Sequence, residues 1–193
     1  MIQRTYLRTL FRSSSQGRTV ILRRFIPTAV PSFLCLLALT TLTSCGQPSD
    51  RSLEATFSEH ESDLIKLVQM ANRDSKFITI APQYVITDNN IEEPPEKALG
   101  EQRWSVYKAL FDTAGVNDGL RRDPHHPGAI FFVASTKGML TGESQKGYAY
   151  SELPLAPTVT SLDRTLPANV SPGSDGIFAF KSLKTNWYLF YYE

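Results

Sequence analysis

An uncharged apolar stretch at residues 25–42 constrains the fold of this chain most, because it separates a basic leader from the part that can form a globular domain. It follows directly on Arg23 and Arg24, and its densest run is FLCLLAL at residues 33–39. A basic region followed by a short apolar core is the order of a signal peptide. Two prolines interrupt the stretch, which falls short of the ~20 predominantly apolar residues that a stable transmembrane helix needs. The pattern therefore predicts a removable signal peptide rather than a permanent span.

The apolar core ends in Leu42-Thr43-Ser44-Cys45. This run resembles the lipobox of bacterial lipoproteins, in which small residues give a peptidase access to the backbone and the cysteine thiol accepts lipid. The resemblance covers residues 1–45 only, and it implies cleavage before Cys45 and acylation of that cysteine. It divides the chain into a signal peptide at 1–44, a lipidated cysteine with a polar tether at 45–52 and a single domain at 53–193.

A lipid anchor implies a location and a first partner for the domain. Two or more lipid chains anchor a protein stably, since each buried methylene contributes about 0.8 kcal/mol. The resemblance thus implies fatty acyl groups such as palmitate on Cys45 and a membrane as partner, outside the cytoplasm. Gly46, rather than Asp, after the cysteine resembles the signal for transport to the periplasmic side of the outer membrane, if the cell has two membranes. An ordinary secretory signal is the alternative, and the long basic region leaves a translation start near Val20 open.

Charge is distributed unevenly along the chain, although the net charge is only +1. Residues 1–44 carry six arginines and no acidic residue, which leaves 14 basic and 19 acidic residues, a net charge of −5, for the 149 residues from Cys45 onward. An acidic domain without a long basic stripe argues against nucleic-acid binding. Cys35 lies in the apolar stretch and Cys45 at the lipid site, so we expect no disulfide in a domain large enough to fold without one.

Apolar residues recur at steps of three and four in two segments, which is the spacing of amphipathic helices. The first segment predicts a helix at 52–73 with Ser52 as N-cap, and the second a helix around 104–114 that Gly115 ends in a left-handed conformation. Alternating and β-branched or aromatic runs predict strands at 77–80, 84–87, 129–134, 148–150, 177–180 and 187–192. The remaining segments predict loops at 88–96 and 117–128, a turn at 142–147 and a long irregular excursion at 153–175.

The order of these elements predicts the fold class. Two helices and several strands with short connections favour an α+β domain, an antiparallel sheet with two amphipathic helices packed on one face. The last strand, at 187–192, is aromatic or apolar on both faces. Such a strand is typical of the buried centre of a sheet, with a ligand groove or lipid contact as the alternative.

The segment Asp123-Pro124-His125-His126-Pro127 contains two of the three histidines of the chain. With Asp118 nearby, His125 and His126 are candidates for a metal or acid–base site. Adjacent histidines between prolines point in different directions, and no HExxH or similar spacing accompanies them, so a solvated turn is the preferred interpretation. His60 falls near the apolar stripe of the first helix, where a half-buried structural histidine is expected. We therefore expect no metal and no cofactor.

The glycine-flanked segment GESQKG at 142–147 places Ser144 two residues before Lys146. It matches neither the GxSxG motif of hydrolases nor the GxxxxGK[ST] motif of phosphate-binding loops. A dyad of Ser144 and Lys146 would need the two side chains to meet and the lysine to lose its proton. A hairpin turn explains the segment better.

No set of residues in the sequence forms a recognisable catalytic constellation. The expected function is therefore a non-enzymatic binding or interaction module on a membrane-anchored envelope lipoprotein, one form being an immunity lipoprotein that neutralises an incoming toxin. Its partner would be an envelope protein or a small ligand. The alternative from another class is a small envelope hydrolase that uses the loop of His125 and His126, or Ser144.

Overall fold

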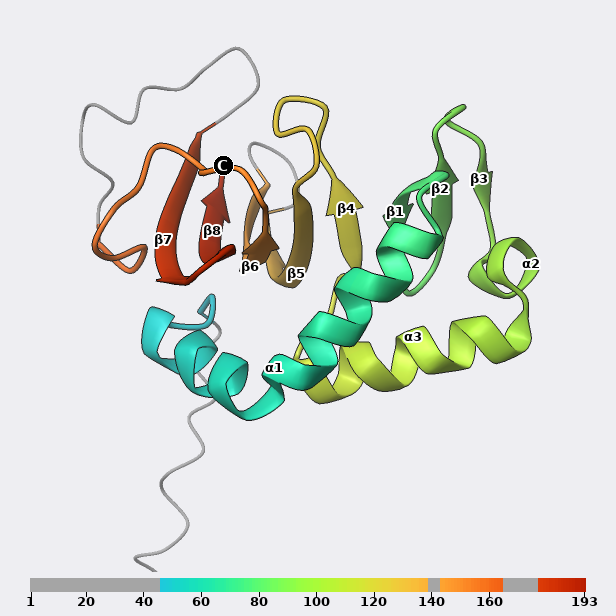
Figure 1. Cartoon of the computed structure of the whole chain (residues 1–193), viewed down its shortest axis with the longest axis horizontal. Helices are drawn as coiled ribbons and strands as arrows, with labels where there is room; N and C mark the ends of the chain where they lie inside the picture. The colour runs from blue at the N-terminus through green and yellow to red at the C-terminus, as the bar shows by residue number, and fades with distance from the viewer. Residues whose placement is uncertain (1–45, 139–142, 165–176) are drawn as a thin grey trace, which may run out of the picture. The chain divides into compact units, whose positions relative to one another are not determined.

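The computed structural model describes residues 46–138, 143–164 and 177–193, so the expected signal peptide at 1–44 and the lipid site Cys45 lie outside the described residues. Within these ranges the chain forms one eight-stranded sheet, in which every pair of neighbouring strands is antiparallel (Figure 1). The strands are β1 (Phe77–Ile80), β2 (Val85–Thr87), β3 (Glu92–Glu93), β4 (Leu120–Arg122), β5 (Ile130–Lys137), β6 (Ser144–Tyr150), β7 (Phe178–Lys184) and β8 (Trp187–Tyr192). Their order across the sheet is β3-β2-β1-β4-β5-β6-β8-β7.

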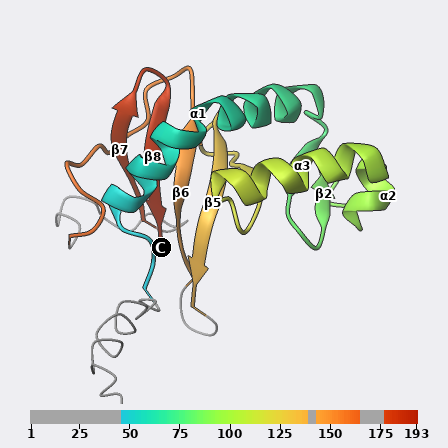
Figure 2. The ribbon, with the colours of Figure 1, turned by 90° about the horizontal axis from the view of Figure 1, so that it is seen from below.

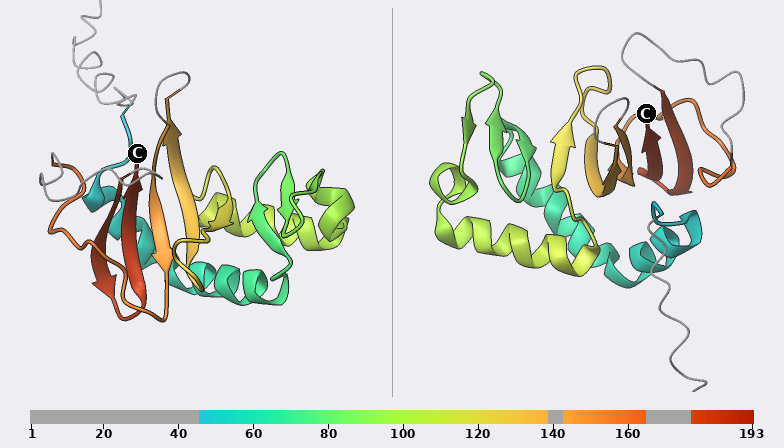
Figure 3. Two further views of the ribbon diagram at one scale, coloured as in Figure 1. Left: turned by 90° about the horizontal axis from the view of Figure 1, so that it is seen from above. Right: turned by 180° about the vertical axis from the view of Figure 1, so that it is seen from behind.

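The helices are α1 (Asp50–Arg73), α2 (Pro95–Leu99) and α3 (Glu101–Ala114). The two long helices, α1 and α3, lie on the same face of the sheet (Figures 1 and 3), so the predicted α+β fold with two amphipathic helices on one face is confirmed. The core between helices and sheet includes fully buried Leu64, Leu67 and Tyr107 from the helices and Phe132 and Leu189 from the strands. None of the helices in the described ranges is long and apolar enough to cross a membrane.

Helix α1 begins earlier than its apolar pattern indicates. Its N-cap is Ser49, whose hydroxyl accepts a hydrogen bond from the backbone N–H of Ser52 at 3.2 Å, so the prediction of Ser52 as N-cap is wrong. The first N–H groups of a helix have no acceptor within the helix, and a serine hydroxyl at the N-cap can accept from one of them. Ser49 takes this position one turn before the first buried leucine of the helix. Half-buried His60 has a non-helical backbone that kinks the helix.

Helix α3 ends as the sequence predicts. Gly115 adopts the left-handed conformation, with φ 65° and ψ 33°, and its N–H donates to the carbonyl of Phe111. Only glycine adopts this conformation without a steric penalty, so the chain can turn sharply after Ala114. The following residues, Val116 to Gly119, then lead directly into β4.

A second apolar cluster lies on the face of the sheet away from the helices. Its fully buried rings are Phe131 of β5, Phe180 of β7 and Phe190 of β8, with Leu155 packed against them. Strand β8 lies between β6 and β7, and Leu189 and Phe190 are buried on opposite faces. The prediction that the aromatic terminal strand is a buried core strand is therefore confirmed.

Three predictions of irregular structure are wrong. The expected loop at 88–96 contains β3 and the start of α2, and the expected loop at 117–128 contains β4. These elements are two to five residues long, too short for a periodic apolar pattern to reveal them. The expected turn at 142–147 is mostly strand, because β6 already starts at Ser144; of that turn, Gly142 lies outside the described residues.

The excursion at 153–175 lies partly outside the described residues, from 165 onward. Its described part has no helix or regular strand, as predicted, but it packs on the sheet: Leu155 and Leu162 are buried, and Thr158 forms a parallel bridge with Phe180. Asp163, at its end, accepts two hydrogen bonds from the backbone N–H of Asp50 at the start of α1.

Candidate functional site

The start of the described chain lies at one end of the sheet, together with the C-terminus, the end of β5 and the start of β6 (Figure 2). Gln47 fixes it there, because its Nε2 donates to the carbonyl oxygen of Ser144 at 3.1 Å and to the hydroxyl oxygen of Ser144 at 3.0 Å. Residues 47–52, which belong to the expected tether, thus pack on the domain or form the first turn of α1. Only Gly46 separates this contact from the expected lipid site.

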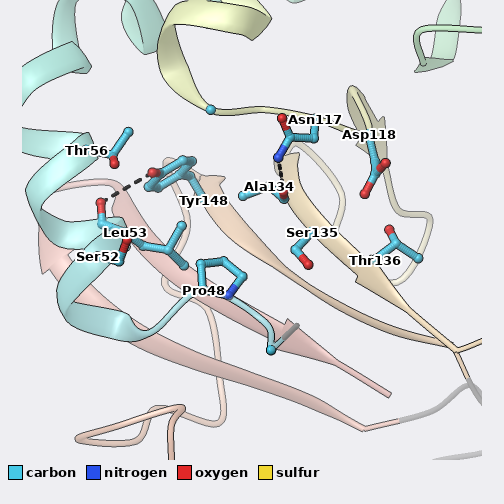
Figure 4. A pocket seen from close by; sticks show the side chains of 12 residues that line it. Pro48, Ser52, Leu53, Thr56, Asn117, Asp118, Ala134, Ser135, Thr136 and Tyr148 are labelled. Carbon is cyan, nitrogen blue, oxygen red and sulfur yellow. Dashed lines mark hydrogen bonds between the residues drawn. The ribbon is translucent and has the colours of Figure 1, made fainter. Parts of the chain in front are cut away.

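A hollow of about 470 Å³ opens beside Gly46 (Figure 4). Its walls come from the start of the chain, the first turns of α1, the connection between α3 and β4, and strands β5 and β6. The lining residues are Gly46, Pro48, Ser52, Leu53, Thr56, Gly115, Asn117, Asp118, Ala134, Ser135, Thr136 and Tyr148. We call this the Gly46 hollow.

Two hydrogen bonds hold the walls of the Gly46 hollow in place (Figure 4). Asn117 Nδ2 donates to the carbonyl of Ala134 at 2.8 Å, which ties the connection after α3 to β5. The Tyr148 hydroxyl donates to the carbonyl of Leu53 at 3.3 Å, which ties β6 to α1. Burial raises the pKa of Tyr148 to about 12, so this phenol keeps its proton at neutral pH.

The side chains that line the Gly46 hollow favour binding of a polar, neutral or cationic group. Hydroxyls of Ser52, Thr56, Ser135 and Thr136 and the carboxylate of Asp118 line it, whereas its lining contains no Lys, Arg or His. Serine is a weak nucleophile unless a neighbouring base activates it. The lining contains no histidine, and no hydrogen bond between the described residues joins one of these hydroxyls to the Asp118 carboxylate, so the hollow offers hydrogen bonds to a ligand but no assembled pair of nucleophile and base.

The two candidate histidines lie in the loop between β4 and β5, away from the Gly46 hollow. His125 is exposed, and its backbone N–H donates to Asp123 Oδ1 at 2.7 Å. The ring of His126 is half-buried, with its centre 5.7, 4.7 and 5.5 Å from those of Phe131, Phe178 and Phe180, so the prediction of a solvated turn is wrong for this residue. Asp118 precedes β4, whereas the two histidines follow it, so strand β4 separates them. The described residues contain no group of three or more His, Cys, Asp or Glu side chains that could hold a metal ion.

Ser144 and Lys146 have separate partners. The hydroxyl of Ser144 accepts from Gln47, whereas Lys146 is 2 % exposed and its Nζ lies 2.8 Å from Asp50 Oδ1 and 2.5 Å from Asp163 Oδ1. An ammonium whose protons point at two carboxylates is not the neutral amine that a general base requires. The geometry therefore does not favour a Ser–Lys dyad.

Lys146 belongs to a buried charge network that joins α1, β6, β7 and the end of the excursion. Lys181 Nζ lies 3.3 Å from Asp50 Oδ2, and the N–H of Leu162 and the hydroxyl of Ser161 donate to the same oxygen. Burial by itself would raise the pKa of Asp50, but Lys146 and these hydrogen bonds outweigh it and lower the pKa to about 2. The network fixes the start of α1, and with it one wall of the Gly46 hollow.

Most residues of the Gly46 hollow were not singled out by the sequence. The sequence indicates Asp118 only as a possible partner of the histidines, and it indicates no site role for Asn117, Ser135 or Thr136. One signal was available: the apolar run 129–134 changes to Ser135 and Thr136 within the same strand, which indicates that β5 leaves the core there.

Comparison of the chain with protein-family models, with curated proteins and with solved structures finds no match. Function therefore has to be argued from the site itself, since fold class alone does not imply function.

Proposed function

We propose that the chain is a lipid-anchored envelope protein whose domain is a non-enzymatic binding module. The observation that carries this proposal is the position of the Gly46 hollow, one residue after the cysteine of the lipobox-like motif. Gln47 is hydrogen-bonded to Ser144, so lipid on Cys45 would hold this end of the domain at the membrane surface. A ligand or partner at that surface would then meet the hydroxyls and the carboxylate of the hollow.

Binding is favoured over catalysis by the separation of the reactive groups. His125 and His126 lie in the loop between β4 and β5, Ser144 is bonded to Gln47, and Lys146 is ion-paired in the buried network. An immunity-type lipoprotein, which neutralises a toxin at the envelope, is one form of the proposed module. The hydrolase alternative has no observation in its favour.

Acyl labelling tests the anchor. Cells that express the full chain are fed a clickable fatty acid, and we expect label on the wild type and on Cys35→Ala but none on Cys45→Ala. Cys35 is the matched control because it is the other cysteine of the chain. Label that persists on Cys45→Ala would contradict the anchor.

Site-specific photocrosslinking tests the binding module. A photoreactive side chain at Ser52, which lines the Gly46 hollow, should form a discrete adduct in intact cells, and Cys45→Ala should reduce it because the precursor then lacks lipid and keeps its signal peptide. Ser62, also exposed on α1 but outside the lining, is the matched control. Adducts of equal yield from both positions, or none from Ser52, would contradict the proposed site.

The same adduct separates the two function classes. Ser144→Ala and the double change His125→Ala with His126→Ala should leave the Ser52 adduct and the cellular phenotype largely intact. Loss of a general base typically lowers a rate by about 10²- to 10⁴-fold, whereas a binding surface spreads its energy over many contacts. Loss of function in a variant that is folded and labelled would favour the hydrolase instead.

A further inference from the structure

A second hollow, of about 430 Å³, lies on the face of the sheet away from the helices. Its walls include Arg121 of β4, Gln145 of β6 and Glu143, which precedes β6. Arg121 pairs in register with Phe131, a residue of the apolar cluster on that face, and so points to the same side. We call this the Arg121 hollow. It adjoins the Gly46 hollow, because Asp118 and Thr136 line both.

Arg121 is the cationic group of this hollow, and no carboxylate pairs with it among the described residues. Its guanidinium carbon lies 5.0 Å from the ring centre of Tyr192, 5.7 Å from that of Phe131 and 5.8 Å from that of Phe178. Its Nε and Nη2 atoms are buried without a hydrogen-bond partner. Burial lowers the pKa of Arg121, but a guanidinium stays charged at neutral pH. A buried donor without an acceptor costs free energy, so these two atoms mark a place where a ligand can supply the acceptor.

Gln145 and Glu143 provide acceptors in the same hollow. Gln145 Nε2 donates to Glu143 Oε1 at 2.7 Å, which orients the amide, and Gln145 Oε1 is buried without a donor. Gln145 pairs in register with Tyr192, the residue whose ring lies closest to the guanidinium. Arg121 and Gln145 therefore both line this hollow, the first with unpaired donors and the second with an unpaired acceptor.

We propose that the Arg121 hollow binds a small zwitterionic group, an oxyanion beside a protonated amine. Arg121 Nε and Nη2 donate to the oxyanion, as a guanidinium does in two-pronged contacts with carboxylate or phosphate. Gln145 Oε1 and the Glu143 carboxylate accept from the ammonium. Two sources carry this chemistry: the ethanolamine phosphate headgroup of a lipid, and an amino acid. The inference goes beyond the proposed function, because it depends neither on the lipid anchor nor on the Gly46 hollow.

Titration calorimetry tests this site, with the full chain purified in detergent micelles and with phosphoethanolamine and β-alanine as probes. We expect saturable binding of at least one probe. Arg121→Met keeps an apolar contact with the three rings but removes the donors, and it should weaken binding by about 10- to 100-fold. Arg51→Met, at an exposed position of α1, is the control and should bind as the wild type does. Stronger binding of phosphoethanolamine assigns a headgroup, and stronger binding of β-alanine assigns an amino acid.

A second variant guards against a folding defect in Arg121→Met. Gln145→Glu places a carboxylate where the amide oxygen lies, so it should pair with Arg121 and abolish binding of both probes, although it also removes the hydrogen bond from Gln145 Nε2 to Glu143; its circular dichroism spectrum should remain that of the wild type. Inorganic phosphate or ethanolamine alone should bind more weakly than phosphoethanolamine. The proposal is overturned if the wild type binds neither probe, if Gln145→Glu binds them undiminished, or if phosphate alone binds as tightly as phosphoethanolamine.

Discussion

Two carboxylates and two ammonium groups meet at the start of α1, and this arrangement joins parts of the chain that are far apart in sequence. Asp50 is 3 % exposed, yet it contacts Lys146 of β6 and Lys181 of β7. Removing one partner of such a group leaves a buried charge that neither water nor another side chain can fully compensate. The network therefore stabilises the packing of α1 on the sheet.

The replacement Lys146→Met should lower the free energy of unfolding by about 3 kcal/mol, because it leaves Asp50 and Asp163 without their shared ammonium. Lys66→Met is the matched control: Lys66 pairs with Asp63 at 2.8 Å, but its side chain is 59 % exposed, and such pairs contribute less than about 1 kcal/mol. Urea denaturation of both variants measures the difference. Equal effects of the two replacements would show that the buried network is not stabilising.

The lowered pKa of Asp50 also predicts how stability depends on pH. A carboxylate with a pKa of about 2 in the folded state and an ordinary value near 3.8 in the unfolded state stabilises the fold fully above pH 4. As the pH falls from 4 to 2, the unfolded chain takes up the proton first, and about 2 kcal/mol of stability should be lost. Denaturation of the wild type and of Asp50→Asn across this range measures the effect. The free energy of unfolding of Asp50→Asn should fall less than that of the wild type between pH 4 and pH 2. Parallel curves of this free energy against pH would contradict the lowered pKa of Asp50.

At the scale of elements, β5 and β6 are neighbouring interior strands of the sheet, and their close approach depends on a glycine. A Cβ atom on Gly147 would lie 2.0 Å from the carbonyl oxygen of Phe132 and 2.8 Å from the N–H nitrogen of Ala134. The strand register shifts at this point, between Val133 and Ser135. A bulge brings two residues of one strand against one residue of the neighbouring strand. The bulge in β5 therefore requires a residue without a side chain at position 147 of β6.

The replacement Gly147→Ala should destabilise the domain by at least about 3 kcal/mol, because backbone atoms on β5 cannot yield as a flexible side chain would. Gly128→Ala is the control, since a Cβ there meets nothing within 4 Å and only the positive φ of 83° opposes it, at a cost of about 1 kcal/mol. Chemical denaturation of both proteins compares the two costs. If Gly147→Ala lowered the free energy of unfolding no more than the control does, β5 and β6 could move apart at this point with little loss of stability.

The elements whose apolar pattern extends over many residues were predictable from the sequence, and the short elements were not. Helix α3 with its Gly115 cap and the strands predicted at 177–180 and 187–192 follow from spacing and composition alone. Strand β4 has only three residues, and its central residue, Arg121, is charged, so no local pattern distinguishes it from a loop. It becomes a strand because β1 and β5 offer it hydrogen bonds on both sides. Both hollows depend on this tertiary pairing, which explains why the sequence did not reveal them.

At the scale of the whole molecule, the described part from Gly46 onward forms one compact unit, and its two apolar clusters share a single sheet. The chain has no cysteine after Cys45, so no disulfide contributes to this part. The start of the domain is closer to the lipid site than the helix pattern predicted. Residues 47–49 already contribute a side-chain contact with β6 and the N-cap of α1.

A fragment of residues 46–193 should therefore fold without lipid, with a melting temperature that a reductant does not change. A fragment of residues 49–193 keeps the N-cap but loses both hydrogen bonds of Gln47 to Ser144, and it should be less stable by about 1 kcal/mol. The point replacement Gln47→Ala in the longer fragment should reproduce this loss, because it removes the same donor. Circular dichroism during heating, with and without reductant, compares the three proteins. Aggregation of the longer fragment would show that lipid or a partner completes the fold, and equal stability of the two fragments would show that Gln47 does not hold the start of the chain on β6.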